Sequence, residues 1–334
     1  MSKLAKPIYA GLAILFSIVV IVMSQGLPPM LQSADAKLST LGPPISVAGD
    51  EPIEPLPKPE GLDPKIVSLG DQLFHDVKLS KDNQVSCASC HQVRKGGDDG
   101  REISLGIENR QGSLNAPTVL NASLHFKQFW DGRADNLEAQ IDGPINNERE
   151  MGSSWPEIIK KLENDSDYRS TFKSLYPEGI SADSIKNAIA TYEKSLVTVD
   201  RPFDRFLKGD QQALTAEEKE GYRRFKGYGC VACHQGVVLG GNLYQKVGLF
   251  GDYFADRGDI KKDDYGRFNV TGKEEDRYSF KVPTLRNIEQ TAPYFHDGSV
   301  PSLSEAVRLM AKYQLGRDIP QSDIDLMIKF LRTL

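Results

Sequence analysis

A five-residue motif, Cys-Ala-Ser-Cys-His at Cys87–His91, constrains this chain more than any other feature, and a second copy stands at Cys230–His234. A C-x-x-C-H sequence is typical of covalent c-type haem attachment, because the thiols can bond to the vinyl groups and the adjacent imidazole can reach the iron. The alternative is a zinc site. The two copies use all four cysteines, so none remains for a disulfide. The predicted attachment residues are Cys87, Cys90, His91, Cys230, Cys233 and His234.

An internal repeat surrounds these motifs. Pro117–Asn121 recurs as Pro283–Asn287, and an Asp-Gly pair follows each proline at the same distance, as Asp131-Gly132 and Asp297-Gly298. A constant offset without gaps is typical of a duplicated unit. The sequence therefore predicts two related haem domains in tandem, each with one covalently bound haem c.

The fold class follows from the periodicity of the apolar residues. Amphipathic helices with start signals, such as the capping-box pair Thr215 and Glu218, recur along the chain, and no alternating strand pattern stands out. We predict an all-α protein with two cytochrome c-like domains. The expected parts are a membrane anchor or signal segment over residues 1–24, a proline-rich linker over 25–62, an N-terminal haem domain over 63–205 and a C-terminal haem domain over 206–334.

The N-terminus predicts export. Residues 7–23 are uncharged and mostly apolar, and they follow Lys3 and Lys6. An uncleaved anchor and a cleaved signal peptide both stay open, and both place the haem domains on the periplasmic side of the inner membrane. The net charge of −5 gives no electrostatic case for nucleic acid but is compatible with a small redox partner.

The two halves of the repeat differ at one informative position. The second half carries Met310, a thioether that can bind haem iron opposite His234, whereas Pro144 stands at the equivalent position of the first half. Proline offers no ligand atom. One haem is therefore expected to be closed by two protein ligands, and the other to have an open position.

Taken together, these residues resemble the bacterial dihaem cytochrome c peroxidase family from about Asp63 to Leu334. The combination and order of the motifs are more specific than a lone C-x-x-C-H. The stretches that carry the resemblance are Cys87–His91, Asn115–Thr118, Gln128–Arg133, Cys230–His234, Ala292–Gly298 and Met310–Gly316.

The resemblance implies a division of labour between the haems. Hydrogen peroxide would react at the low-potential haem held by His91. The haem between His234 and Met310 would relay electrons from a reduced monohaem cytochrome c or a cupredoxin. The family also allows a homodimer.

The resemblance further implies roles for residues near the first haem. Glu150 falls on the distal acid-base carboxylate and Gln140 on its hydrogen-bonding partner, while Phe129 and Trp130 fall on an aromatic pair near the haems. A carboxylate at that place can take a proton from peroxide and return it to the departing oxygen. Trp130 would lie between the haems on the electron path.

A calcium ion between the domains is the third implication. The matching ligands are the side-chain oxygen of Asn115 and the backbone carbonyls of Thr291 and Pro293, with waters completing the shell. Oxygen ligands of this kind suit calcium. Because they come from both domains, the ion would couple the placement of the domains to activity.

The chain departs from the family at Ile107, where many members have a histidine that caps the resting peroxidatic iron. Isoleucine cannot bind iron, so we expect the first haem to be five-coordinate or to hold only water when oxidised. His75 and His125 are expected to be ordinary packed or surface histidines. His296 is expected to orient the second haem pocket through a hydrogen bond.

The predicted function is reduction of hydrogen peroxide to water at the expense of a small electron carrier. Two alternatives stay open. One is an enzyme of the same superfamily that oxidises a protein or organic substrate through high-valent iron, as the methylamine-utilisation dihaem enzyme does; that relative has tyrosine in place of Met310. The other is a dihaem electron-transfer cytochrome without chemistry of its own.

Overall fold

The computed structural model describes residues 51–334, which belong to one compact unit. Within this range the chain is mainly helical, as predicted, with one short antiparallel ribbon of β1 (Tyr244–Lys246) and β2 (Ser279–Lys281) that the sequence did not reveal. The α-helices are α2 (Pro64–His75), α3 (Cys87–Cys90), α4 (Leu137–Asn146), α5 (Trp155–Glu163), α6 (Ser166–Leu175), α7 (Ala182–Ser195), α8 (Pro202–Leu207), α9 (Ala216–Tyr228), α10 (Tyr253–Arg257), α11 (Phe268–Thr271), α12 (Leu303–Leu315) and α13 (Gln321–Leu331). Single 3₁₀ turns are η2 (Val77–Leu79), η3 (Val93–Lys95), η4 (Ile107–Asn109), η5 (Ala122–Leu124), η6 (Cys230–Ala232), η7 (Lys262–Tyr265), η8 (Glu274–Asp276) and η9 (Ile288–Gln290).

The predicted membrane segment over residues 7–23 lies outside the described residues. Among the helices of residues 51–334, none combines the length and the apolar character that crossing a bilayer requires.

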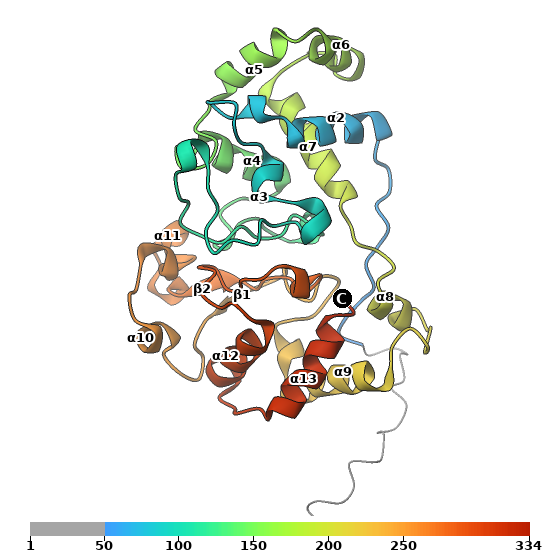
Figure 1. The fold of residues 1–334 in the computed structure, drawn as a ribbon, viewed down its shortest axis with the longest axis vertical. Coiled ribbons are helices and arrows are strands. Elements are labelled where there is room, and N and C mark those ends of the chain that lie inside the picture. Colours follow the sequence, from blue (N-terminus) through green and yellow to red (C-terminus); the bar gives the residue numbers. More distant parts are fainter. Residues whose placement is uncertain (1–50) are drawn as a thin grey trace, which may run out of the picture. The chain divides into compact units, whose positions relative to one another are not determined.

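The N-terminal lobe is built around the crossing of α2 and α7 (Figure 1). The helices meet at Gly70, where an added Cβ would lie only 2.0 Å from the backbone oxygen of Ala188. A glycine is therefore needed for this close approach. Around the crossing lies an apolar core that includes Leu69, Leu73, Phe74, Ile141, Ile158, Phe172, Ile185 and Ile189.

The C-terminal lobe repeats this arrangement with α9 and α13 (Figure 1). An added Cβ at Gly221 would lie 2.0 Å from the backbone oxygen of Leu326, the same contact as in the first lobe. The predicted capping box of Thr215 and Glu218 is present at the start of α9. Aromatic rings fill the space beside the crossing, namely Phe203, Tyr222, Phe225 and Phe330.

The short helix α8 belongs to the C-terminal lobe. The backbone N–H of Phe203 donates to the oxygen of Thr333 at 3.2 Å. Asp204 and Arg286 form a fully buried ion pair with an N···O distance of 2.8 Å. The Asp204–Arg286 pair and the bond of Phe203 to Thr333 therefore join α8 to the C-terminal lobe. The predicted boundary at residue 205 falls inside α8, and the division between the two domains stays a prediction.

The described end of the proline-rich segment, residues 51–62, forms no helix or strand, but it is not a free linker. Ile53 and Leu56 are each only 2% exposed. The N–H of Leu56 donates to Asp204 Oδ1 at 3.0 Å, and the oxygen of Glu54 accepts from Arg286 Nη2 at 2.9 Å. The ordered packing therefore includes residues before Asp63, because this segment supplies acceptors and apolar side chains to the C-terminal lobe.

The two repeats meet at Thr198. Its hydroxyl oxygen accepts one hydrogen bond from Asn121 Nδ2 and one from Asn287 Nδ2, both at 3.0 Å. The two asparagines occupy equivalent positions of the repeat and both have left-handed backbone angles, with φ of 63° and 59°. Thr198 thus ties the two lobes together at matching points.

Candidate functional site: two haem cavities

Each C-x-x-C-H motif lines a cavity of the size that bound cofactors occupy. We call the cavity of about 430 Å³ at Cys87–His91 the N-terminal cavity, and the one of about 480 Å³ at Cys230–His234 the C-terminal cavity. Burial raises the pKa of the Cys87 thiol to about 12 and that of Cys230 to about 11. A cavity of this size beside each motif fits an attached haem, whereas a structural zinc ion is enclosed by four ligands.

The two motif histidines are oriented in the same way. His91 Nδ1 donates to the oxygen of Gly97 and His234 Nδ1 donates to that of Leu239, each at 3.1 Å. Burial lowers the pKa of both imidazoles. The rings are therefore neutral, with Nε2 free to bind a metal, which is the arrangement that haem iron requires.

The threonine of each repeated Pro-Thr segment stabilises the turn that orients the motif histidine. The hydroxyl of Thr118 donates to the oxygen of Gly96 at 2.6 Å, and that of Thr284 donates to the oxygen of Val238 at 2.6 Å. Each threonine thereby fixes the turn whose next carbonyl accepts the bond from the motif histidine. The same contact is therefore made by the equivalent threonine in both repeats.

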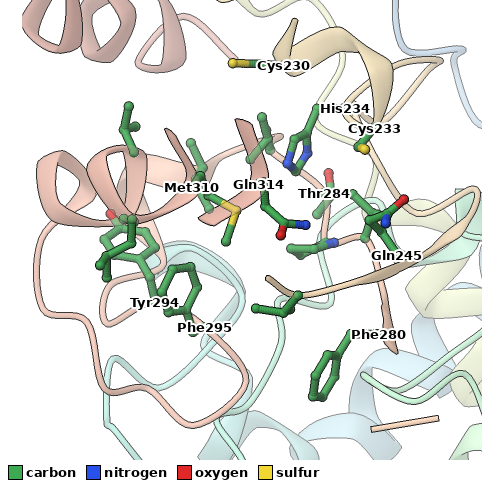
Figure 2. Close-up of a pocket in the computed structure, with 18 of the residues that line it drawn as sticks. Cys230, Cys233, His234, Gln245, Phe280, Thr284, Tyr294, Phe295, Met310 and Gln314 are labelled. Carbon is green, nitrogen blue, oxygen red and sulfur yellow. The ribbon is translucent and has the colours of Figure 1, made fainter. Parts of the chain in front are cut away.

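The C-terminal cavity has ligand atoms on two sides. Met310 lies on α12 and lines the cavity together with His234 and both motif cysteines (Figure 2). Apolar and aromatic side chains, among them Phe280 and Phe295, form much of the remaining wall. Two thiols, an imidazole and a thioether in an apolar cavity fit a covalently attached haem with two axial ligands.

The N-terminal cavity has no methionine at the position equivalent to Met310. Pro144 lines it from α4 at the position equivalent to Met310. Ile107 is 4% exposed and is not among the lining residues. Its Cδ1 lies 2.4 Å from where a Cβ at Gly152 would stand, so the side chain packs into the protein interior. Neither position offers a ligand atom to this cavity.

Glu150 faces the N-terminal cavity from the turn after α4. Burial raises its pKa, while the hydrogen bond from Asn147 and the charge of Arg133 lower it. The bond runs from Asn147 Nδ2 to Glu150 Oε1 at 2.7 Å. Gln140 lines the same cavity, but among the described residues it makes no hydrogen bond to Glu150. Asn147 is therefore the side-chain partner of Glu150 in this structure, and the pairing of Gln140 with the carboxylate stays a prediction.

The loop before Asn115 fixes the backbone of Glu150. The N–H of Ile107 donates to the oxygen of Glu150 at 2.8 Å. An added Cβ at Gly106 would lie 2.1 Å from the oxygen of Arg149 and 2.4 Å from that of Glu150. The glycine allows this contact, so the loop positions the carboxylate at the cavity.

Phe129 and Trp130 line both cavities and so form part of the wall between them. Trp130 Nε1 donates to the oxygen of Asn115 at 2.9 Å, and the Trp130 oxygen accepts from the N–H of Lys281 at 2.8 Å. The indole is thus held within the N-terminal lobe, while the backbone of Trp130 is bonded to the C-terminal lobe. Arg133 covers the ring of Phe129, with its guanidinium carbon 3.5 Å from the ring centroid.

The predicted calcium ligands lie at the junction of the lobes. Asn115 is 6% exposed, its Nδ2 donates to the oxygen of Arg101 at 2.9 Å, and its N–H donates to the oxygen of His296 at 2.9 Å. Thr291 and Pro293 line the C-terminal cavity with Asn115. Within residues 51–334, Asn115 Oδ1 and the two backbone oxygens accept no hydrogen bond. Oxygens without donors are the chemistry that calcium requires.

His296 lines the C-terminal cavity, but its ring nitrogen is bound elsewhere. Nε2 and Asp264 Oδ1 are 2.7 Å apart, and Arg257 bridges Asp264 and Asp297. The side chains of Asp264, His296 and Asp297 are close enough together to hold a metal. Because the Arg257 guanidinium pairs with both carboxylates, we interpret the group as an ion-pair network that fixes His296.

One of the two spare histidines differs from expectation. His75 lies exposed at the end of α2, as predicted. His125 lines both cavities, and its Nδ1 accepts a hydrogen bond from Lys281 Nζ at 3.0 Å. The sequence analysis did not single out Lys281 and did not place His125 at a cavity. The available signal was one lysine in the otherwise uncharged run Tyr278–Leu285.

Comparison with known proteins agrees with the geometry. The family described as di-haem cytochrome c peroxidase matches residues 64–212. The chain is 48% identical over 286 residues to cytochrome c peroxidase Ccp of Escherichia coli, covering 85% of this chain and 61% of that protein. It is 45% identical over 291 residues to cytochrome c551 peroxidase of Nitrosomonas europaea, covering 86% and 85%. Methylamine utilization protein MauG of Methylorubrum extorquens is 36% identical over 256 residues, with coverage of 76% and 70%.

Solved structures show the same architecture. A MauG-like protein associated with microbial copper homeostasis superposes with a TM-score of 0.71 at 29% identity, covering 84% of this chain and 92% of that one. The diheme peroxidase BthA from Burkholderia thailandensis shares the fold, with a TM-score of 0.68 at 20% identity and coverage of 82% and 86%. With its paired haem cavities and these relatives, the chain belongs to the di-haem cytochrome c peroxidase family.

Proposed function

We propose that this protein reduces hydrogen peroxide to water with electrons from a small reduced cytochrome c or cupredoxin. The observation that carries the proposal is the difference between the cavities. Met310 faces the C-terminal cavity, whereas Pro144 and the carboxylate of Glu150 face the N-terminal one. A haem with an open iron position supplies the redox chemistry when bound, and the chain provides the groups that handle protons.

Glu150 is the group that moves the proton. Its Oε1 is held by Asn147, so the other carboxylate oxygen is available to peroxide. The carboxylate would accept a proton from one oxygen of peroxide and return it to the other oxygen, which leaves as water when the O–O bond breaks. A bound haem would supply the electrons for this cleavage. A raised pKa suits this exchange, because it brings the acid and base forms closer in energy near neutral pH.

Trp130 and Phe129 occupy the wall that electrons must cross. The indole N–H of Trp130 donates to the oxygen of Asn115, which fixes the ring, and the backbone oxygen of Trp130 accepts from the N–H of Lys281. Electrons enter at the lobe with His234 and Met310 and leave toward the lobe with His91. The thioether of Met310 favours a high potential for the entry site.

Calcium at Asn115, Thr291 and Pro293 is part of the same proposal. The ion would join a side chain of the N-terminal lobe to two carbonyls of the C-terminal lobe. Chelation with EGTA is expected to weaken electron transfer between the haems, and added calcium to restore it. Unchanged rates after calcium removal, verified by metal analysis, would argue against this site.

The location proposed for the protein is the periplasmic side of the inner membrane, held there by residues 7–23 or released after their cleavage. The positive flank of Lys3 and Lys6 before an apolar run supports export. Cell fractionation followed by N-terminal sequencing separates the anchored form from the cleaved form. Light scattering of the purified protein decides between a monomer and a homodimer.

The test of the main proposal follows oxidation of reduced cytochrome c by hydrogen peroxide. Glu150→Gln is expected to lower turnover by about 10²–10⁴-fold, because the amide cannot accept the proton. Glu148→Gln changes an exposed carboxylate in the same turn and serves as the matched control. Absence of peroxide-dependent turnover in the wild type would reject the peroxidase function, and equal turnover of both variants would reject the role of Glu150.

A second candidate is oxidation of a protein or organic substrate, supported by the 36% identity to MauG. The thioether of Met310 at the second haem counts against it. A protein that carries both haems but turns over neither peroxide nor such substrates would instead be an electron-transfer cytochrome.

A further inference from the structure

Lys281 is a buried cation at the wall between the two cavities. The residue is 6% exposed and lines both cavities. Within residues 51–334 it forms no salt bridge, and its ammonium donates a hydrogen bond to the neutral ring of His125. A buried ammonium without a counter-ion is costly, so an anion is missing from its surroundings.

The backbone fixes where the side chain of Lys281 can go. Lys281 ends β2 and pairs with Tyr244 of β1, and its N–H donates to Trp130. Its neighbours Phe280 and Val282 also line the C-terminal cavity. The backbone of Lys281 is therefore fixed beside Trp130, and its ammonium lies at His125 in the wall shared by the two cavities.

His125 adds a second donor at the same place. Because Nδ1 accepts from Lys281, the ring proton is on Nε2. That atom is buried and has no hydrogen-bond partner. A Cβ at Gly241 would lie 2.6 Å from His125 Cδ2, so the close backbone holds the ring in place. An ammonium and an unsatisfied N–H donor thus lie next to each other.

The nearby charges do not neutralise this site. The carboxylate of Asp131 attracts the charge of Lys281 and so raises its pKa, but this carboxylate already forms a salt bridge with Arg133 at 3.0 Å. Burial lowers the pKa of Lys281 to about 8 and lowers that of His125. In this protein the anions that enter these cavities are haem carboxylates, because each haem c carries two propionates.

We propose that Lys281 and His125 form a shared anion site that binds a propionate carboxylate of one or both haems. The site deepens the assignment of two haems and is independent of the peroxide reaction. It places a fixed positive charge on the path between the irons. A positive charge favours the reduced form of a nearby iron, so Lys281 is a positioning residue that also raises the potential of the haem it holds.

The experiment is a spectroelectrochemical titration of the dihaem protein without peroxide. In Lys281→Met, at least one haem is expected to become harder to reduce by tenfold or more, about 59 mV for a one-electron couple. Lys281→Arg keeps the charge and is expected to restore most of the shift. Lys262→Met removes an exposed positive charge at the rim of the N-terminal cavity and serves as the control, with a much smaller shift expected.

The separate optical signals of the two haems show which propionate is bound. A shift in one haem assigns the site to that cavity, and shifts in both assign it to both. Potentials of Lys281→Met that match those of the control would overturn the proposal. If Lys281→Met does not retain two haems, His125→Phe replaces it; this variant removes the N–H donor and is expected to shift the same haem in the same direction, and an unshifted His125→Phe would also overturn the proposal. Loss of peroxidase activity does not affect these readouts.

Discussion

The two lobes use the same parts on one side of their cavities and different parts on the other. In both lobes, two helices cross in close contact at a glycine. In both, the threonine of a Pro-Thr segment also fixes the turn whose carbonyl accepts a hydrogen bond from the motif histidine. On the opposite wall, α12 presents Met310 to one cavity while α4 presents Pro144 to the other. The two motif histidines are thus oriented by equivalent contacts, whereas the opposite walls of the two cavities carry different side chains.

The largest effect is expected from Met310→Leu, which removes the thioether at nearly constant volume. Without this ligand the C-terminal haem should become harder to reduce by at least about tenfold, since thioether ligation raises haem potentials. Potentiometry and the optical band of the methionine-bound haem measure the change. Met327→Leu, a buried methionine of the same cavity, is the control and should leave the potential unchanged. An equal shift in both variants would contradict the assignment of Met310.

Alanine at Gly70 or Gly221 tests the shared half of the comparison. Each added methyl would overlap a backbone oxygen at 2.0 Å, so the helices must separate. We expect a loss of about 1–3 kcal/mol in the free energy of unfolding for each variant. Denaturant titration monitored by circular dichroism gives the values. Gly227→Ala in α9, where an added Cβ meets no atom, should not destabilise the protein, and comparable losses at Gly227 would remove the explanation by close packing.

Thr198→Val removes the hydroxyl to which both repeats are tied. Asn121 and Asn287 would each lose an acceptor, and burial of unpaired amide groups costs about 1–3 kcal/mol. Thermal unfolding of the dihaem protein measures this loss. Thr198→Ser retains the oxygen and should recover most of it; a serine variant as unstable as the valine variant would point to the methyl group instead.

The smallest expected effect is the position of the acidic limb of the activity profile. Glu150 must be ionised to accept the proton, and burial raises its pKa above the usual value of a glutamate. Turnover is therefore expected to fall as the pH decreases through this raised pKa, at a higher pH than for an exposed glutamate. Arg133→Gln removes a charge that lowers this pKa and should move the limb to still higher pH. If the acidic limb of Arg133→Gln lies at the same pH as that of the wild type, the charge of Arg133 does not influence the pKa of Glu150.

Much of the site was predictable from sequence because its signals are local or periodic. The haem motifs span five residues each, the repeat has a constant offset, and the difference between Met310 and Pro144 can be read by aligning the chain with itself. Helical periodicity and end signals likewise predicted the mainly helical fold, down to the capping box of α9.

Contacts between distant segments were not predictable, since no local pattern encodes them. Asp204 is buried against Arg286, far along the chain, and this pair joins α8 to the C-terminal lobe. Lys281 carries an ordinary charge in the sequence. Only the packing of β2 against Trp130 and His125 turns that charge into a buried cation between two haem cavities, because burial depends on which surfaces meet in the folded chain.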